Sequence, residues 1–427
     1  MGKNIFIPGL DDFNLSKLQA LPEASDYTFH QLLSLRELQP VDKDPKAIKH
    51  VLHAVEDRLR AFPGSIDAIV GYWDYPVSTM VPLLCRQFGL PAAPLRSVMA
   101  CEHKYWSRVE QQEVIPECVP PFQSVDPFDD AALDKMELDY PFWLKPIKAH
   151  SSQLGFKIES DQDFRESMKP IRQDIGHFAA IFNHLLEQVE VPPKIRPVDG
   201  GYCIAEGIIS GRQCTVEGFI FDGEAQTYGV IDSIREPGSS SFARFQYPSS
   251  LNDPVKERIA AAAKKIMTHV GYDNAAFNIE FFYDESADRL WLLEINTRVS
   301  QSHSYLFDKV DGKSNFSIML DLGLGRRPAL TPGQGTYRCA GKFFLRKYED
   351  ALVKTVPSEE ELRRLHAEFP EAAVKVSVEA GTRLSELPTQ ESYSYELAEI
   401  MLGGENEAEL LHKHERCREL LTFTFVE

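Results

Sequence analysis

Hydrophobic and polar residues alternate along the first hundred residues in a pattern typical of a βαβ unit. A short apolar run predicts a strand at residues 4–7, and residues 45–62 place apolar side chains at helical spacing. Residues 66–71 form a continuous apolar run, as in a buried parallel strand, and a helix is predicted at 78–88. Parallel sheets bind ligands at the carboxyl ends of their strands. Asp74, which follows the second strand, is therefore either a substrate contact or a helix cap.

The middle of the chain mixes strands with helices. Residues 142–146 predict a strand, and two further strands, at 202–209 and 213–220, flank a short turn. A helix is predicted from Asp253 to Gly271, because an acceptor cap and a proline open it and one apolar stripe runs along it. This helix leads directly into a predicted β-hairpin.

Proline and glycine residues cluster at 326–335 and indicate a linker. Beyond it we expect strands at 340–345 and 373–378, a helix that opens with a capping box at 358–361, and a helix at 408–421. The pattern predicts an α/β protein in three parts. The expected domains are an N-terminal βαβ domain at 1–96, a central domain at 97–330 with a small subdomain at about 140–210, and a C-terminal α+β domain at 331–427.

Two glutamates interrupt strands that are otherwise apolar. Glu280 and Glu294 are 14 positions apart, and each lies within an apolar run. If residues 285–289 form the loop of a hairpin, Asp284 pairs with Leu290 and Glu280 lies directly opposite Glu294. Like charges in apolar surroundings are tolerated only when one carboxyl group is protonated or a cation lies between them.

Further polar side chains are expected beside this glutamate pair. By strand alternation, Asn296 and Arg298 share a face with Glu294, and so do Leu290 and Leu292, which suggests a pocket rather than an open surface. The alternative is an exposed sheet face with solvated acids. Mg²⁺ takes oxygen ligands, usually one or two carboxylates together with phosphates and water. We therefore predict a magnesium site whose ligands are Glu280, Glu294 and Asn296.

Composition narrows the class of protein. The chain has 427 residues, more than one ordinary core requires, and a net charge of −18 without a clustered basic stretch, which argues against nucleic acid or an anionic membrane as partner. No apolar run approaches the ~20 residues that span a bilayer, and no signal peptide is recognised, so we expect a cytoplasmic protein. Seven cysteines without a C-x-x-C pair suggest neither a zinc site nor disulfides.

Seven residues, taken in chain order, resemble the signature of the ATP-grasp ligases, and most closely that of the carboxylate–amine, or L-amino-acid, ligase branch. The resemblance extends over residues 65–325 and implies an ATP-grasp fold between a βαβ domain and a C-terminal α+β domain. It is based on Lys104, Lys145, Glu206, Glu280, Glu294, Asn296 and Arg298.

The resemblance implies an ATP site. Lys104 and Lys145 would bind the phosphates, for which a compact ammonium charge is suited. The loop that contains Ser152 would close over them, although a plain surface turn is the alternative. The residues implied at adenine are Glu206 and Ile209, and Gln213 is implied at the ribose, where relatives often have a carboxylate.

The implied reaction is activation of a carboxylate as an acyl phosphate, followed by attack of an amine such as an amino acid. Arg298 would contact the transferring phosphate or the carboxylate, and Ser302 and His303 the acceptor, with His303 as a base or simply a turn residue. The expected cofactors are ATP and Mg²⁺, and the partners are small molecules, with a homodimer left open. Two alternatives remain: a biotin-carboxylase-like enzyme that activates bicarbonate, and a non-catalytic ATP-binding regulatory protein.

Overall fold

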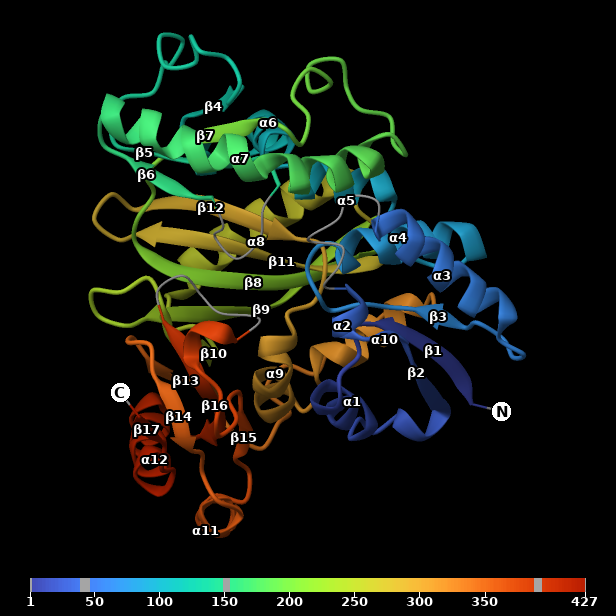
Figure 1. The fold of residues 1–427 in the computed structure, drawn as a ribbon. Helices are drawn as coiled ribbons and strands as arrows, with labels where there is room; N and C mark the ends of the chain where they lie inside the picture. Colours follow the sequence, from blue (N-terminus) through green and yellow to red (C-terminus); the bar gives the residue numbers. More distant parts are fainter. Residues whose placement is uncertain (1, 39–46, 149–153, 388–393, 427) are drawn as a thin grey trace.

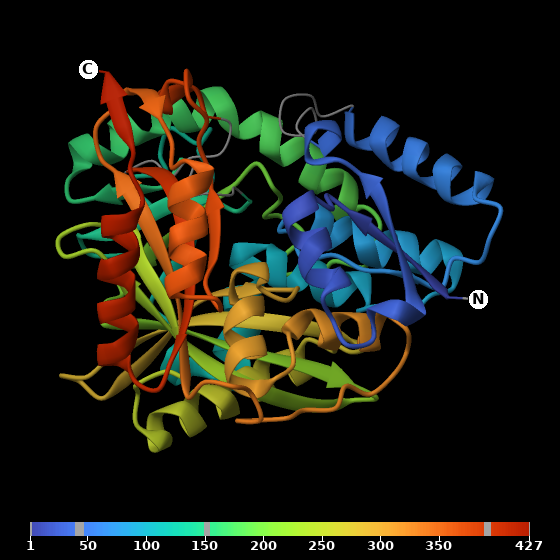
Figure 2. The same cartoon turned by 90° about the horizontal axis from the view of Figure 1, so that it is seen from below.

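The computed structural model describes residues 2–38, 47–148, 154–387 and 394–426, and these form a mixed α/β structure built around several sheets. Figure 1 shows the N-terminal elements on one side, a small sheet with a long helix above, and a large sheet that continues into the C-terminal elements. In the view from below, the N-terminal and C-terminal elements lie on opposite sides of the central strands (Figure 2). Among the described residues, no helix combines the length and apolar character needed to cross a membrane.

The N-terminal domain has the predicted βαβ character. Its parallel sheet has the order β2-β1-β3. The elements of this part are β1 Lys3–Pro8, α1 Asp12–Gln19, η1 Ala24–Asp26, β2 Tyr27–Leu33, α2 Leu35–Leu38, α3 Ala47–Ala61, β3 Ala68–Ile69 and α4 Val77–Phe88. Helix α5 Leu95–Glu102 crosses the predicted boundary at residue 96, and α6 Lys104–Val114 lies beyond it. Strand β2 was not predicted, because only its last two residues are buried and its sequence shows no strong period. Helix α4 ends as expected at Gly89, whose φ of 67° is left-handed.

A four-stranded antiparallel sheet forms the small subdomain, in the order β4-β7-β5-β6. Its strands are β4 Phe122–Val125, β5 Phe142–Pro146, β6 Phe156–Ile158 and β7 Cys203–Gly207, after the 3-10 helix η3 Pro116–Cys118, and helix α7 Asp161–Leu186 packs on it. The expected turn at 210–212 does not join two strands of one sheet. It joins β7 to β8 of the large sheet, so the chain passes there from one sheet to the other.

The large sheet has eight strands in the order β12-β11-β8-β9-β10-β13-β16-β15. Its strands are β8 Arg212–Phe221, β9 Glu224–Arg235, β10 Phe242–Tyr247, β11 Ala275–Asp284, β12 Arg289–Asn296, β13 Cys339–Lys347, β15 Ala373–Val376 and β16 Tyr395–Gly404. Because β10 pairs with β13, the sheet continues across the linker predicted at 326–335. The domain limits 97–330 and 331–427 thus separate strands of one sheet, and they remain a prediction.

Helices and short elements complete the layers around this sheet. They are α8 Asp253–His269, η4 Gln301–His303, α9 Ser304–Asp311, α10 Asn315–Gly323, β14 Leu352–Thr355, α11 Glu359–Glu368, η5 Leu384–Glu386, α12 Glu407–Leu420 and β17 Thr424–Val426. Helix α8 packs its apolar stripe on β8, β11 and β12 to form the central core. The capping box predicted for α11 is present, since the side chains of Ser358 and Glu361 each accept a hydrogen bond from the other's backbone N–H. All seven cysteines are buried and free.

Candidate functional site

The glutamate hairpin forms as predicted, with one difference in register. Glu280 on β11 pairs directly with Glu294 on β12, but Asp284 pairs with Arg289 and not with Leu290. The loop is therefore one residue shorter than expected, and a β-bulge between positions 280 and 281 restores the predicted pair. Leu293 is the extra residue of the bulge.

Because of the bulge, the faces predicted for the side chains of β12 are wrong. Leu290 and Leu292 do not share a face with Glu294; both are buried in the core under α8, together with Ile295. The extra residue at Leu293 shifts the alternation by one, so the apolar positions before and after it face the same side. Glu294 consequently faces away from the core, and the strand has one apolar face and one polar face.

Glu280 lies opposite a second carboxylate, and few hydrogen-bond donors compensate its negative charge. It accepts hydrogen bonds from Gln213 Nε2 at 2.8 Å and Asn296 Nδ2 at 3.3 Å. Burial, reinforced by the negative charge of Glu294, raises the pKa of Glu280 to about 7. The position favours either a proton on Glu280 or an added cation.

Glu294, by contrast, lies among positive charges. Its Oε1 is 3.2 Å from Lys104 Nζ, and its side chain is 45% exposed to the cleft. Partial desolvation of the carboxyl group opposes ionisation, but the charges of Lys104, Lys145 and Lys148 outweigh it and hold the pKa of Glu294 at about 2. The two predicted lysines therefore lie within electrostatic reach of the glutamate pair.

Glu206 connects the small sheet to the large one. Its carboxylate lies 2.5 Å from Lys145 Nζ and 2.5 Å from Arg108 Nε. Burial is again outweighed by the two cations, which hold the pKa of Glu206 at about 2. Arg108 also donates to the backbone carbonyls of Leu292 at 2.8 Å and Leu293 at 2.9 Å. Glu206 thus orients Lys145, while Arg108 joins β7 to the bulged strand.

A pocket lies between the two sheets, where the resemblance implies the nucleotide. Its lining includes Lys104, Arg108, Lys145, Glu206 and Glu294. Ile209, the other residue implied at adenine, is half-buried in the segment between β7 and β8. Ser152 lies outside the described residues.

Gln213 lies beside the glutamate pair. It is 6% exposed, and its amide oxygen accepts hydrogen bonds from Arg235 Nη2 at 2.7 Å and Nε at 3.0 Å while its nitrogen donates to Glu280. The ribose role implied for Gln213 remains a prediction. The structure shows in addition that the uncharged amide of Gln213 bridges Glu280 and Arg235 by hydrogen bonds.

Arg298 joins the central domain to the N-terminal domain. Its Nε and Nη2 donate to the two carboxylate oxygens of Asp74, both at 2.6 Å, a planar bidentate pair. No helix N-terminus accounts for the Asp74 side chain, because α4 lacks a side-chain cap. A mainly apolar cavity, lined among others by Val81, Tyr272 and Met319, borders Arg298.

His303 is buried, with 3% exposure, and its Nδ1 lies 2.7 Å from Oε1 of Glu217. The Glu217 carboxylate also accepts from Tyr228 Oη at 2.6 Å and Asn315 Nδ2 at 3.0 Å. His303 thus belongs to a closed hydrogen-bond network inside the fold, which favours the turn-residue alternative over the base. Ser302 accepts from Lys342 Nζ at 3.1 Å.

The sequence did not predict a further buried ion pair, between Lys148 and Glu102. Lys148 Nζ contacts Glu102 Oε2, and both side chains are less than a tenth exposed. Glu102 Oε1 also accepts from Ser78 Oγ at 2.6 Å and Thr297 Oγ1 at 3.2 Å. The sequence shows only that Lys148 follows Lys145 by three positions; the pairing with Glu102 arises from tertiary contact.

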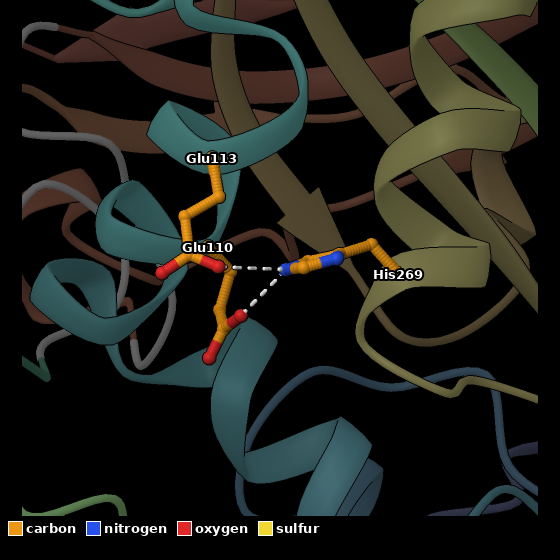
Figure 3. Close-up of side chains that lie close together, drawn as sticks. All are labelled: Glu110, Glu113 and His269. Atoms are coloured by element: carbon orange, nitrogen blue, oxygen red, sulfur yellow. Dashed lines mark hydrogen bonds and ion pairs between the residues drawn. The ribbon is translucent and has the colours of Figure 1, made fainter.

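Figure 3 shows a separate group of potential metal ligands, Glu110 and Glu113 from α6 with His269 from α8. His269 Nε2 lies 2.8 Å from Glu110 Oε2 and 3.5 Å from Glu113 Oε2. Trp106 Nε1 donates to the other Glu110 oxygen at 2.7 Å, and Lys194 pairs with Glu113. These groups satisfy one another's hydrogen bonds between α6 and α8.

Sequence comparisons agree with this geometry. Residues 246–327 match the family model described as the ATP-binding domain of the carbamoyl-phosphate synthase L chain. A D-alanine–D-alanine ligase of Synechococcus sp. (strain CC9605) is 30% identical over 169 residues, which are 39% of this chain and 43% of that protein. A urea amidolyase of Saccharomyces cerevisiae (strain ATCC 204508 / S288c) is 24% identical over 317 residues, 72% of this chain and 15% of that protein. The chain therefore aligns with less than half the length of either relative.

Solved structures resemble the whole chain. The L-amino acid ligase from Bacillus licheniformis superposes with a TM-score of 0.74 at 15% identity, over 100% of this chain and 99% of that one. The biotin carboxylase from Campylobacter jejuni gives a TM-score of 0.67 at 14% identity, over 100% and 92%. The fold of the chain is therefore the ATP-grasp fold that its ordered residues predicted.

Proposed function

We propose that this protein is an ATP- and Mg²⁺-dependent ligase that activates a carboxylate as an acyl phosphate and couples it to an amine such as an amino acid. The observation that supports this most directly is the position of Glu280 opposite Glu294, with Lys104 Nζ 3.2 Å from Glu294. A carboxylate pair next to phosphate-binding lysines is what a metal–nucleotide site requires.

The donor set fits a hard divalent cation. Glu280 and Glu294 offer carboxylate oxygens on one sheet face, and Asn296 would offer its amide oxygen after a rotation of the amide, which as placed donates to Asn278 at 3.0 Å. The raised pKa of Glu280 indicates that nearby positive charge does not compensate for the burial of this carboxyl group and for the charge of Glu294. A bound Mg²⁺ would supply that charge and neutralise phosphate oxygens during phosphoryl transfer.

Lys104 and Lys145 are placed to bind phosphate, although each now pairs with a carboxylate of the pocket. Lys145 forms an ion pair with Glu206, and Lys104 forms one with Glu294. Each ammonium group is therefore already oriented toward the pocket by a carboxylate. Two such charges offset part of the triphosphate charge in a site of low dielectric constant. No side-chain nucleophile is required, because the substrate carboxylate itself attacks the γ-phosphate.

Arg298 is suited to hold that carboxylate. Its guanidinium is fixed by the bidentate pair with Asp74, and it borders the mainly apolar cavity described above. A planar fork next to an apolar cavity matches an acid with an apolar body. Arg298 would also stabilise the charge that develops as phosphate transfers to the acid.

The experiment is a measurement of phosphate and ADP release from ATP while carboxylic acids and amino acids are supplied singly and in pairs. The proposal expects release that depends on a particular pair. Release that depends on bicarbonate alone would favour the carboxylase alternative, which the similarity to urea amidolyase and to the biotin carboxylase fold keeps as the second candidate. Nucleotide binding without release under any pair would favour the regulatory alternative.

A further inference from the structure

Arg108, on α6, contacts both sheets of the candidate site although its side chain is buried, with 3% exposure. Its Nε donates to Glu206 Oε1 of β7 at 2.5 Å, and Glu206 Oε2 in turn lies 2.5 Å from Lys145 Nζ. On the other side, Nη1 and Nη2 donate to the backbone carbonyl groups of Leu292 at 2.8 Å and Leu293 at 2.9 Å on β12. One guanidinium group therefore joins the small sheet to the bulged strand of the large sheet.

The two carbonyl groups that Arg108 binds belong to successive residues at the bulge. In a regular strand, successive carbonyl groups point to opposite edges, so a single side chain could not donate to both. The extra residue at Leu293 interrupts this alternation. The planar fork of Arg108 thus fits the bulged form of β12 and not the regular form.

The bulge decides which way Glu294 faces. Leu290 and Leu292 lie in the core under α8, and strand alternation without a bulge would put Glu294 on that same apolar face. With the bulge, Glu294 Oε1 lies 3.2 Å from Lys104 Nζ instead. A group that stabilises the bulge therefore also fixes the direction of the predicted metal ligand.

The position of Arg108 on α6 is well defined. It follows Lys104 by four residues, so the two side chains lie one turn apart on the same face of the helix. Lys104 contacts the side chain of Glu294, and Arg108 contacts the backbone directly before it. Gln111 Oε1 accepts from Arg108 Nη1 at 2.6 Å, and Gln111 Nε2 donates to Ser107 Oγ at 2.8 Å. A lysine could not reproduce this set of contacts, because its ammonium group has no planar fork.

We propose that Arg108 is a positioning residue for phosphoryl transfer, which holds the bulged strand so that Glu294 faces the nucleotide phosphates and the lysines that bind them. This inference rests on the proposed ligase function and adds a residue to its machinery. Arg108 acts through Glu294, and through Glu206, which orients Lys145. Loss of its fork should therefore weaken the metal site more than it weakens the binding of the nucleotide itself.

The test compares Arg108→Lys with the wild-type protein by electron paramagnetic resonance of Mn²⁺ in the presence of a non-hydrolysable ATP analogue. The variant keeps a positive charge beside Glu206 but lacks the fork that holds β12. We expect the Mn²⁺ affinity to fall about tenfold or more, while the affinity for the analogue without metal changes by less than about threefold. With the substrate pair that supports phosphate release, kcat should fall about thirtyfold or more and the KM for ATP should change little.

Arg258→Lys is the matched control. Arg258, on α8, binds the far end of the same hairpin, where Nη1 donates to Asp288 Oδ1 at 2.5 Å and Nη2 to the Asp288 carbonyl at 3.0 Å. It thus also holds a backbone carbonyl group of this hairpin, but its side chain is 43% exposed. The control should keep the Mn²⁺ affinity and the kcat of the wild-type protein.

A second variant keeps the inference testable if Arg108→Lys does not fold, which circular dichroism would show. Gln111→Leu removes one acceptor that orients the Arg108 guanidinium and should weaken Mn²⁺ binding about threefold, with metal-free nucleotide binding unchanged. Mn²⁺ binding by Gln111→Leu equal to that of the wild-type protein would then overturn the inference.

Two results with a folded Arg108→Lys would overturn the inference. One is a Mn²⁺ affinity equal to that of the wild-type protein. The other is a loss of metal-free nucleotide binding as large as the loss of Mn²⁺ binding, which would make Arg108 a direct nucleotide contact. Because Mn²⁺ binding with the analogue needs no turnover, absence of phosphate release from the wild-type protein would contradict the ligase proposal and leave the role of Arg108 readable.

Discussion

Two glutamates on neighbouring strands of the large sheet, the buried Glu217 and the half-buried Glu280, have opposite surroundings. Glu217 on β8 pairs in register with Asn278, two residues before Glu280 on β11. Glu217 is fully buried and accepts from His303, Tyr228 and Asn315, so protein groups satisfy its charge. Glu280 has one amide donor at 2.8 Å, a weaker one at 3.3 Å and a second carboxylate opposite. A carboxylate whose charge is compensated by protein groups indicates a structural role. A carboxylate with too few compensating groups indicates a ligand-binding site.

The largest effect should follow from removal of the metal-facing carboxylate. Glu294→Ala is expected to lower the rate of phosphate release by about a thousandfold or more, because it removes one ligand and the carboxylate that lies 3.2 Å from Lys104. Circular dichroism should show an unchanged fold. Glu285→Ala, in the loop of the same hairpin and 61% exposed, should keep full activity. Full activity of Glu294→Ala would contradict the metal assignment.

Removal of the satisfied carboxylate should act on stability instead. Glu217→Ala removes the acceptor of His303 and Tyr228 and leaves Asn315 Nδ2 with only the Ser300 carbonyl, which should cost about 3 kcal/mol of unfolding free energy. Urea denaturation measures this loss. Glu224→Ala, on the exposed end of β9 and 73% exposed, is the control and should change stability by less than about 0.5 kcal/mol. A loss for Glu217→Ala no larger than that of the control would show that the network contributes nothing.

The pH dependence of stability should show the state of the Glu280 carboxyl group. The pKa of Glu280 is about 7 in the fold, above its ordinary value of 4.5, so the protonated form is favoured on folding. Its contribution is complete below about pH 4.5 and is lost as the pH rises through 7, about 2 kcal/mol in the absence of metal. Denaturation in EDTA at several pH values should show this slope, and Glu280→Gln should abolish it. An identical slope in Glu280→Gln would assign it to another group.

The smallest effect on activity is expected when Arg298 loses its hydrogen-bond partner Asp74 in the N-terminal part of the chain. Asp74→Asn removes the bidentate partner of Arg298 and should lower kcat/KM for the carboxylate about tenfold, with little change in the KM for ATP. Asp67→Asn, which breaks the Lys3 pair within the N-terminal domain, is the control. Equal effects on both substrates would indicate that Asp74 only holds the domains together.

The sequence predicted the fold and the glutamate pair because both depend on the order of residues along the chain and on strand alternation. Glu280 opposite Glu294 followed from counting back along the hairpin. The bulge at Leu293 could not be predicted, because a single extra residue leaves no mark in the apolar pattern, and the expected faces of Leu290 and Leu292 were therefore wrong.

Other features depend on contacts between distant segments. The pairing of Arg108 with Glu206, and of Lys148 with Glu102, joins residues 98 and 46 positions apart. The partner of His303 is Glu217, 86 positions away. Sequence pattern shows that such charged residues occur in apolar surroundings, but it does not show which of them meet.

The central claim is that the Glu280–Glu294 face binds a divalent cation together with nucleotide phosphate. Electron paramagnetic resonance of Mn²⁺, with a non-hydrolysable ATP analogue, counts the bound ions directly. We predict nucleotide-dependent Mn²⁺ binding to the wild-type protein that weakens by about tenfold or more in Glu280→Gln and in Glu294→Gln, with Glu285→Gln unaffected. Equal Mn²⁺ binding by all four proteins would contradict the account.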